Sequence, residues 1–167
     1  LLYLTIGSKA ATLLTFYDNG IRYRVYDSDR KYAEIIGYYY PSHDLVIPNS
    51  ACYTWGYNNK SYYTVMRISA DAFKDCTSIT SITLSEKIYD VGANAFEGCS
   101  NLKNFYVDSK NDRFISNDGV LYDKYDRIYA FPPARSNNYT IKYGTKTIMN
   151  GAFATSKLNK LIVPNSI

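Results

Sequence analysis

One phrase of the sequence is written twice, at a fixed offset of 23 residues. The first copy, ISADAFKDCTSITSITL, occupies residues 68–84, and the second, VGANAFEGCSNLKNFYV, occupies residues 91–107. Neither copy is long enough to bury its own apolar face, so the repeat predicts units that stack and bury that face against their neighbours. Six equivalent positions carry apolar or thiol side chains in both copies: Ile68 and Val91, Phe73 and Phe96, Cys76 and Cys99, Ile79 and Leu102, Ile82 and Phe105, and Leu84 and Val107.

The end of each copy alternates apolar and polar side chains, which is the pattern of a strand with one buried face. We therefore predict short strands at about residues 78–84 and 101–107. A third copy, IMNGAFATSKLNKLIVP, begins at Ile148, carries Ser156 in place of the cysteine, and predicts a strand at about residues 157–163. Because successive units stack by translation, we expect the three strands to be parallel.

An Ala-Phe pair stands in every copy between the first apolar residue and the strand. The small alanine lets two backbones approach closely, and the phenylalanine fills the space behind it. We expect Phe73, Phe96 and Phe153 to be buried in one column, stacked repeat on repeat. Upstream, the half-copy LVIPNS supplies Leu45 and Ile47.

Between the second and third copies the chain leaves the repeat. In RFISNDGVLYDKYDRIYAFPP, the dipeptide Asp118-Gly119 separates two strand-like runs and is a strong hairpin signal. A second reversal between Asp123 and Asp126 predicts a small inserted β-meander. The runs GIRYRVY, YAEIIGYYY and SYYTVMRI predict further strands in the N-terminal third, and helix is expected only as short turns around the Ala-Phe pairs.

These patterns predict a β-rich fold, a right-handed solenoid of short parallel strands with little helix and an inserted hairpin or meander. We expect residues 1–167 to form a single repeat domain and to be a fragment of a longer chain, because LIVPNSI stops in mid-repeat without a polar cap. The expected divisions are an N-terminal strand or cap region at 1–67, two regular repeats at 68–107, the hairpin insertion at 108–147, and a truncated third repeat at 148–167.

The repeat Ala-Phe-x-x-Cys-x-x-Leu-x-x-Ile-x-Leu, the segment NDGVLYDK, and GIRYRVY followed by LVIPNS resemble the BspA-type leucine-rich repeat family, over roughly residues 16–167. The resemblance implies a secreted or cell-surface protein of a host-associated bacterium or protist, with binding or adhesion as its usual role. The family offers no motif of catalytic residues to carry over. The chain departs from the family pattern at Ser85 and Asp108, where proline is usual, and at Ser156.

Charge and hydropathy exclude some classes of partner. The net charge is +4, but lysines and arginines are scattered, so the clustered footprint of a nucleic-acid binder is missing. The sequence contains no window of 18 apolar residues, so we predict no transmembrane segment. The apolar opening LLYLTIGSKA is either the remainder of a secretory signal or a first strand.

Cysteine and histidine chemistry favour a protein without a catalytic or metal site. Cys76 and Cys99 occupy equivalent positions about 5 Å apart, and their side chains should point in parallel, so we expect a buried, reduced thiol ladder. Cys52 is the odd cysteine. The single histidine, His43, has no accompanying nucleophile motif, and the acidic turn NDGVLYDKYD lacks the spacing of a calcium loop. We expect no enzyme activity, no cofactor and no metal.

Recognition remains as the function to predict. Polar positions within stacked strands form one continuous outer face, and Tyr106, Ile162 and Val46 are larger and more apolar than a solvated face requires. With Asn104 and Thr83 they form the candidate binding site for an unidentified protein or glycan. The alternative interpretation is that these residues pack beneath repeats missing from this chain, beneath the hairpin insertion, or beneath a neighbouring domain.

Three functions stay in competition: a surface or secreted binding and adhesion module, a structural spacer, and an accessory glycan-binding protein. The 19 tyrosines bear on this choice, because a tyrosine ring serves either core packing or a recognition surface. Their solvent exposure separates the two possibilities.

Overall fold

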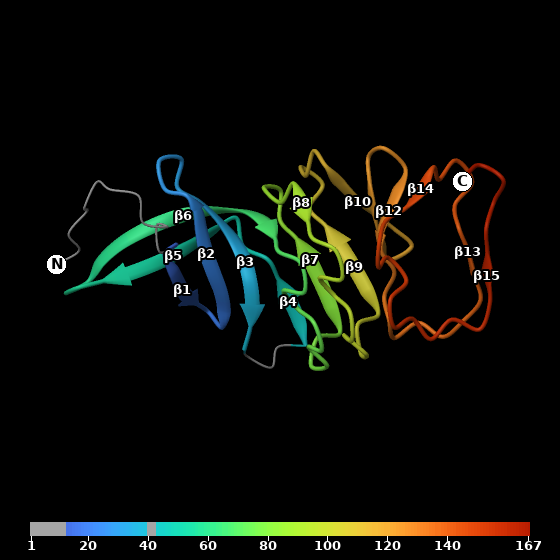
Figure 1. Ribbon diagram of the computed structural model, residues 1–167, viewed down its shortest axis with the longest axis horizontal. Helices are drawn as coiled ribbons and strands as arrows, with labels where there is room; N and C mark the ends of the chain where they lie inside the picture. The colour runs from blue at the N-terminus through green and yellow to red at the C-terminus, as the bar shows by residue number, and fades with distance from the viewer. Residues whose placement is uncertain (1–12, 40–42) are drawn as a thin grey trace.

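The structure is a computed structural model that describes residues 13–39 and 43–167; the segment LLYLTIGSKA therefore lies outside the described residues. Within those ranges every regular element is a β-strand, and no described helix is long and apolar enough to cross a membrane. The strands follow one another along an elongated body, with the N-terminal sheet at one end and β13 (Tyr139–Thr140) and β15 (Leu161–Ile162) at the other (Figure 1). The predicted β-rich fold without long helices is confirmed.

The N-terminal sheet has the order β1-β2-β3-β6-β5, and β8 pairs with Arg67 and Ile68 at the end of β6, beyond the residues that pair with β5. Strands β1 to β3 form an antiparallel meander, β5 and β6 an antiparallel hairpin, and β6 pairs with β3 and β8 in parallel. The sheet curls until the Cys52 amide of β5 donates to the Asp18 carboxylate of β1 at 2.8 Å. The bounds are β1 Thr15–Asp18, β2 Ile21–Asp27, β3 Tyr32–Tyr38, β5 Ser50–Trp55, β6 Asn59–Ile68 and β8 Asp90–Val91.

Local sequence explains the meander. In GIRYRVY the apolar side chains of Ile21, Tyr23 and Val25 are buried, and the intervening arginines face outward, as period-2 alternation requires. The preceding turn, Asn19-Gly20, has positive φ at both residues, which matches the two-residue hairpin that twisted strands prefer. Three strand predictions of the N-terminal third are confirmed as β2, β3 and β6, whereas β1 and β5 were not predicted.

The repeat strands form a parallel sheet in the order β4-β7-β9, as expected. Strand β7 pairs with β9 in unbroken register, so equivalent positions of the two copies face each other at an offset of 23 residues. The buried side chains of this sheet include Leu45, Ile82 and Phe105. The bounds are β4 Asp44–Val46, β7 Ser81–Leu84 and β9 Asn104–Val107.

Behind this sheet, the turns of the first two copies hydrogen bond to each other. The Phe73 amide donates to the Ala95 carbonyl at 2.8 Å, and the rings of Phe73 and Phe96 stack with centroids 5.8 Å apart. No helix forms here; the Ala-Phe pairs lie in successive turns. Gly98 lies so close to the preceding turn that a Cβ there would meet an Asp75 carboxylate oxygen at 2.0 Å.

Between copies two and three lies a three-stranded antiparallel meander followed by a parallel strand, in the order β10-β11-β12-β14. The reversal expected at Asp118-Gly119 is present, with positive φ at both residues. The bounds are β10 Phe114–Asn117, β11 Val120–Asp123, β12 Arg127–Ala130 and β14 Thr147–Ile148.

The third copy differs from the prediction. Its strand, β15 (Leu161–Ile162), is shorter than the predicted 157–163 and pairs in parallel with β13 (Tyr139–Thr140), not with β9. The reason is a unit that the pattern did not reveal, with its own Ala-Phe pair at Ala130-Phe131. The Phe131 amide donates to the Ala152 carbonyl at 2.6 Å, the same bond that links copies one and two.

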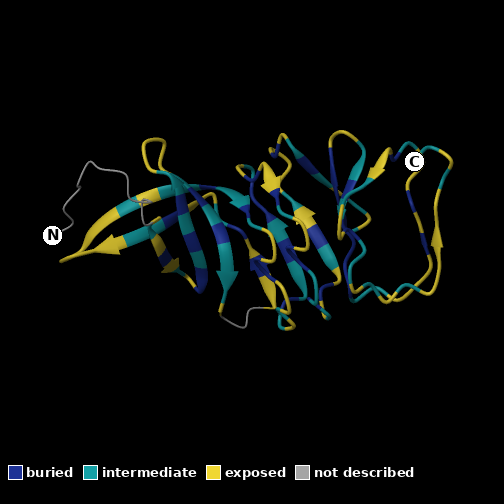
Figure 2. Ribbon diagram, in the orientation of Figure 1, coloured by how far each residue is buried: buried dark blue, intermediate teal, exposed yellow. Residues whose placement is uncertain are grey.

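The expected single column of phenylalanines is therefore wrong for its last member. Phe153 is half-buried and stacks on Phe131, with centroids 5.1 Å apart, in a second apolar cluster. Phe73 and Phe96 belong to the larger cluster, which extends into the N-terminal sheet. Buried bands run along β2, β7 and β9, whereas exposed residues gather at the tip of the β5–β6 hairpin and on β15 (Figure 2).

Candidate functional site

The outer face of the β4–β7–β9 sheet carries one row of side chains from all three strands. Parallel register places Val46 opposite Thr83, and Thr83 opposite Tyr106. Val46 is 65% exposed and Tyr106 is 51% exposed, and the smaller Thr83 between them is half-buried. The row therefore presents two exposed, largely apolar side chains on either side of the smaller Thr83.

A polar row runs beside it, formed by Asp44, Ser81 and Asn104. The Ser81 hydroxyl donates to the Asp44 carboxylate at 2.6 Å, and the Thr80 hydroxyl donates to the same oxygen at 3.1 Å. These hydrogen bonds, from Ser81 first and Thr80 second, lower the pKa of Asp44. His43 precedes this row and is exposed, as expected for a turn residue.

The β10–β11 hairpin borders this face at the free edge of β9. The Phe105 amide donates to the Gly119 carbonyl at 2.8 Å, and the Ser116 hydroxyl donates to the Phe105 carbonyl at 2.6 Å. Since Tyr106 stays half exposed, the hairpin flanks the row and does not cover it. The alternative interpretation, in which the hairpin buries the apolar side chains of the face, is therefore excluded for Tyr106.

Arg135 fixes the hairpin in this place, and sequence reasoning missed it. Its guanidinium pairs with the Asp118 carboxylate at 2.9 Å and lies over the rings of Phe131 and Tyr139, with Cζ 5.5 and 5.6 Å from the centroids. Gly119 packs against the side chain of Asn104, where a Cβ would meet the amide oxygen at 2.4 Å. The dipeptide at the hairpin tip was visible in the sequence, but nothing there links it to residue 135.

Ile162 lies apart from the other candidate residues. It is 43% exposed on β15 and pairs with Thr140 of β13. The tip of the β10–β11 hairpin occupies the edge of β9 that faces away from β7. Tyr106 and Ile162 therefore do not lie in one hydrogen-bonded sheet. Tyr106 and Ile162 were expected on one continuous outer face of stacked strands, but they lie in separate sheets, and Val46, Thr83, Asn104 and Tyr106 are the residues that one sheet brings together.

The three cysteines are free thiols. Cys99 is buried and its thiol donates to the Phe73 carbonyl at 3.0 Å, whereas Cys76 is only half-buried, against the expectation that both are inaccessible. Burial raises the pKa of Cys99 to about 12, and burial is also the first cause of a raised pKa at Cys76. Both shifts favour the neutral thiol, so neither residue is an activated nucleophile.

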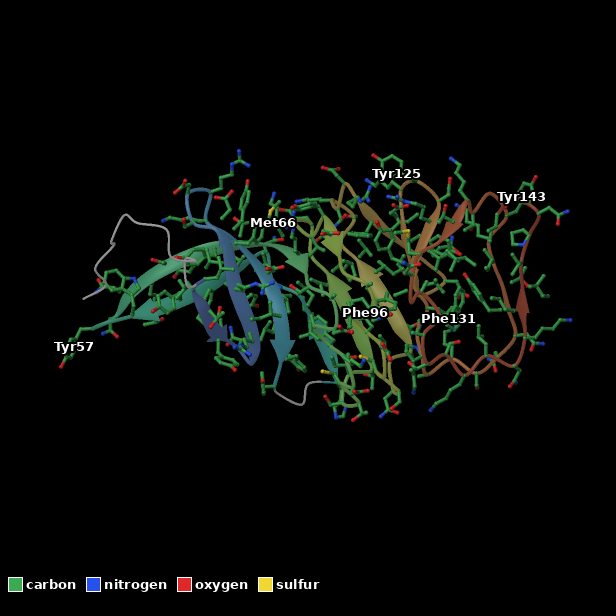
Figure 3. The ribbon with its side chains drawn as sticks, viewed as in Figure 1. Tyr57, Met66, Phe96, Tyr125, Phe131 and Tyr143 are labelled. Atoms are coloured by element: carbon green, nitrogen blue, oxygen red, sulfur yellow. The ribbon has the colours of Figure 1, made fainter. Side chains whose placement is uncertain are left out.

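Tyrosine exposure favours a surface role for many of these rings. Of the 17 described tyrosines, three are buried and eight are exposed; Tyr38, Tyr53, Tyr63 and Tyr129 are partly buried against the larger core cluster. Core packing and the surface thus each take a share of these rings. Three exposed ones, Tyr57, Tyr125 and Tyr143, stand on different segments along the length of the molecule (Figure 3). Among residues 13–39 and 43–167, no cluster of three or more histidine, cysteine, aspartate or glutamate side chains could hold a metal ion.

Solved structures share this fold at low sequence identity. A leucine-rich repeat protein from Bacteroides capillosus has a TM-score of 0.55 and 21% identity, over 90% of this chain and 99% of that chain. A leucine-rich cell surface protein from Faecalibacterium prausnitzii has a TM-score of 0.54 and 17% identity, over 92% of this chain and 44% of that chain. A leucine-rich repeat protein from Bacteroides ovatus has a TM-score of 0.54 and 21% identity, over 90% of this chain and 42% of that chain.

The chain thus spans less than half the length of two of these three proteins. A search of curated proteins finds no significant match. The family model of the BspA-type leucine-rich repeat region, in six copies, matches residues 47–118 and 126–167. This match covers β7 and β9 of the first parallel sheet and both strands of the second parallel pair, β13 and β15, and the chain belongs to the BspA-type leucine-rich repeat family.

Proposed function

We propose that this protein is a non-enzymatic binding module, secreted or displayed at the cell surface, that contacts a protein or glycan through the outer face of β4, β7 and β9. The observation that carries the proposal is the row in which Val46 and Tyr106 stay largely exposed although Leu45 and Phe105, the residues before them in each strand, are buried. Large apolar side chains on a regular, rigid sheet are what a recognition surface requires, because little conformational entropy is lost when a partner docks.

The polar row supports the same role. Hydrogen bonds from Ser81 and Thr80 hold the Asp44 carboxylate in place, and Asn104 is held beside Gly119, so polar groups of fixed orientation border the apolar row. An apolar centre with a polar border is the usual arrangement of protein interfaces. Tyr106 supplies contact area and one hydroxyl group with few rotatable bonds.

Membership of the family and the description of the Faecalibacterium prausnitzii protein as a cell surface protein support the proposed location. Adhesion to a host or environmental macromolecule is the finer form of this proposal. We also infer that the repeats continue as one right-handed solenoid, which would let further units extend the binding face; the parallel pairs β7–β9 and β13–β15 support this inference.

The proposal is tested by presenting the protein to immobilised extracellular-matrix proteins and to a glycan array, and by repeating each positive measurement with Tyr106→Ala. We expect this variant to weaken binding by about tenfold or more, as truncation of a central tyrosine does. Lys157→Ala, in an exposed turn outside the face, is the control and should leave binding unchanged. Circular dichroism and thermal unfolding verify that both variants fold.

Two results would contradict the proposal. The first is the absence of binding to every protein and glycan presented, which favours the spacer function. The second is a ligand whose affinity is the same for the parent protein and for Tyr106→Ala, because that ligand then binds elsewhere on the molecule.

A further inference from the structure

A cluster of arginine and tyrosine side chains surrounds the tight turn between β11 and β12. At its base the Asp123 carboxylate is fully buried. One oxygen accepts from the amides of Tyr125 and Arg127, at 2.9 and 3.1 Å, which fixes the turn. The other oxygen contacts Nη2 and Nε of Arg127 at 2.6 and 2.7 Å, and Nη2 of Arg113 at 3.6 Å. One buried carboxylate thus holds two guanidinium groups.

Aromatic rings hold the same two arginines from their other sides. The guanidinium carbons of Arg113 and Arg127 lie 5.1 and 5.5 Å from the centroid of the Tyr125 ring. Arg113 also donates to the Tyr129 hydroxyl at 3.0 Å. The conformational entropy that a flexible arginine loses on binding a ligand has therefore been lost already on folding, which is the condition for a preorganised site.

These side chains line an open hollow of about 500 Å³ together with Lys146 and Thr147. None of the described residues that line it is acidic, and Asp123 lies beneath its floor. Two arginines and a lysine against one carboxylate leave the hollow positively charged. Two further carboxylates do not cancel this excess, because Asp126 of the turn and Asp112 before β10 each pair with a lysine outside the lining.

Tyr125 gives the hollow an aromatic wall. It is 61% exposed and projects from the β11–β12 turn at the edge of the molecule (Figure 3). A second hollow, of about 300 Å³, shares Thr147 with the first and is lined by Tyr129, Ile148 and Met149 among others. A ligand longer than one chemical group can therefore extend from the charged hollow along β14.

We propose that this hollow binds an acidic saccharide, with the carboxylate of a uronic acid or the sulfate ester of a sulfated sugar held by Arg113, Arg127 and Lys146. The guanidinium N–H groups that Asp123 and Tyr129 leave unused can make charge-assisted hydrogen bonds to the oxygens of these anions. The exposed face of a tyrosine ring packs against the C–H face of a pyranose, and the Thr147 hydroxyl is placed to hydrogen bond with sugar hydroxyls. The site is independent of the β4–β7–β9 face.

Isothermal titration calorimetry tests the proposal with four probes: a uronic-acid oligosaccharide, a sulfated oligosaccharide, a neutral oligosaccharide of equal length, and a glutamate-rich peptide. We expect one of the acidic saccharides to bind, and the one that binds identifies the anionic group. Affinity should fall as sodium chloride is raised from low to physiological concentration, because exposed charges are screened. The neutral oligosaccharide and the peptide should bind at least about tenfold more weakly.

Two variants locate the binding. Lys146→Glu should weaken binding of the acidic saccharide by about tenfold or more, and Tyr125→Ala should weaken it by a smaller factor. Lys160→Glu makes the same change of net charge at an exposed position outside the hollow and should retain the parent affinity. Thermal unfolding verifies the fold of each variant; Tyr125→Ala still tests the site if the charge reversal at Lys146 destabilises the protein.

Several outcomes would overturn the proposal. No binding of either acidic saccharide refutes it, and so does equal binding of the neutral oligosaccharide. Tighter binding of the acidic peptide replaces the saccharide by a protein ligand. Equal losses in Lys146→Glu and Lys160→Glu show that net charge, and not this hollow, attracts the ligand.

Discussion

Replacing Asn111 by alanine should destabilise this protein more than almost any other polar substitution. Asn111 follows β9 and is buried, and its amide group serves four backbone groups. Its nitrogen donates to the carbonyls of Ser85 and Ile88, both at 2.8 Å, and its oxygen accepts from the amides of Arg113 and Phe114 at 2.8 and 2.7 Å. One side chain therefore joins the loop after β7 to the start of β10.

The magnitude follows from these four bonds. A buried backbone group left without a partner costs about 1–3 kcal/mol. Relaxation and entering water will satisfy some of the groups again, so we expect Asn111→Ala to lower the free energy of unfolding by about 3–5 kcal/mol. Because single domains are stable by only about 5–15 kcal/mol, the variant should lose a large part of its stability.

Urea unfolding followed by circular dichroism measures the effect, with Asn101→Ala as the matched control. Asn101 makes one side-chain bond, to the Thr77 carbonyl at 2.8 Å, and is exposed. Water replaces that partner, so the control should change stability by about 0.5 kcal/mol or less. A loss below about 1 kcal/mol for Asn111→Ala, or equal losses in the two variants, would refute the claim that these four hydrogen bonds stabilise the fold.

Three further predictions concern the packing of the repeats. Phe73→Ala should cost about 3–5 kcal/mol of unfolding free energy, and Phe153→Ala clearly less because Phe153 is half-buried; equal costs in urea unfolding would contradict the two-cluster core. Because the folded-state pKa of Cys99 is about 12, its thiolate forms first in the unfolded chain, so stability should fall as pH rises from about 9 towards 12, and a rise would be the contrary result. Gly98→Ala should destabilise more than Gly144→Ala in thermal unfolding, since both have positive φ but only Gly98 has a neighbouring side-chain oxygen where its Cβ would lie; equal shifts would show that backbone strain alone matters.

The part of the fold that sequence predicted is the part in which local pattern and stacking agree. Alternation in the two regular copies fixed the buried positions of β7 and β9, and their constant spacing fixed the parallel register. The hairpin at Asp118-Gly119 followed from local turn chemistry. Each of these features depends on residues close in sequence or on one repeated offset.

The additional unit at Ala130-Phe131 was missed for a physical reason. Its Ala-Phe pair is followed by Pro132-Pro133 in place of the polar turn, so no copy of the full motif can be read there. As a result, the turn of the second copy contacts the turn of the third copy directly: the Gly98 amide donates to the Thr155 hydroxyl at 3.0 Å. A search for the Ala-Phe pair alone, without its turn, would have found the unit, because Phe131 and Phe153 are 22 residues apart.

The sequence predicted to which side the residues of the candidate face point, but not which strands contribute to that face. Alternation alone showed that Val46, Thr83 and Tyr106 point to the same side of parallel strands, and the structure places them in one row. The separation of Ile162 depends on which strand pairs with β9, and such long-range pairing leaves no mark in the local pattern. The arginine hollow was invisible for the same reason, since Arg113, Arg127 and Lys146 are scattered in sequence. They gather only because β10 pairs with β11 and β12 pairs with β14.

The interruption of the repeat connects the two candidate sites. Where two regular copies meet, as at β7 and β9, the front strands pair directly and their outer face is continuous. Between copy two and the Phe131 unit, the β10–β11 hairpin occupies the free edge of β9, which fixes the border of the Tyr106 face. The chain then passes from β11 to β12 through the turn that Asp123 fixes. This turn places Tyr125 and Arg127 beside β14, outside the stacked repeat units. An uninterrupted array of 23-residue units would have a longer sheet face but no position from which these cations could project.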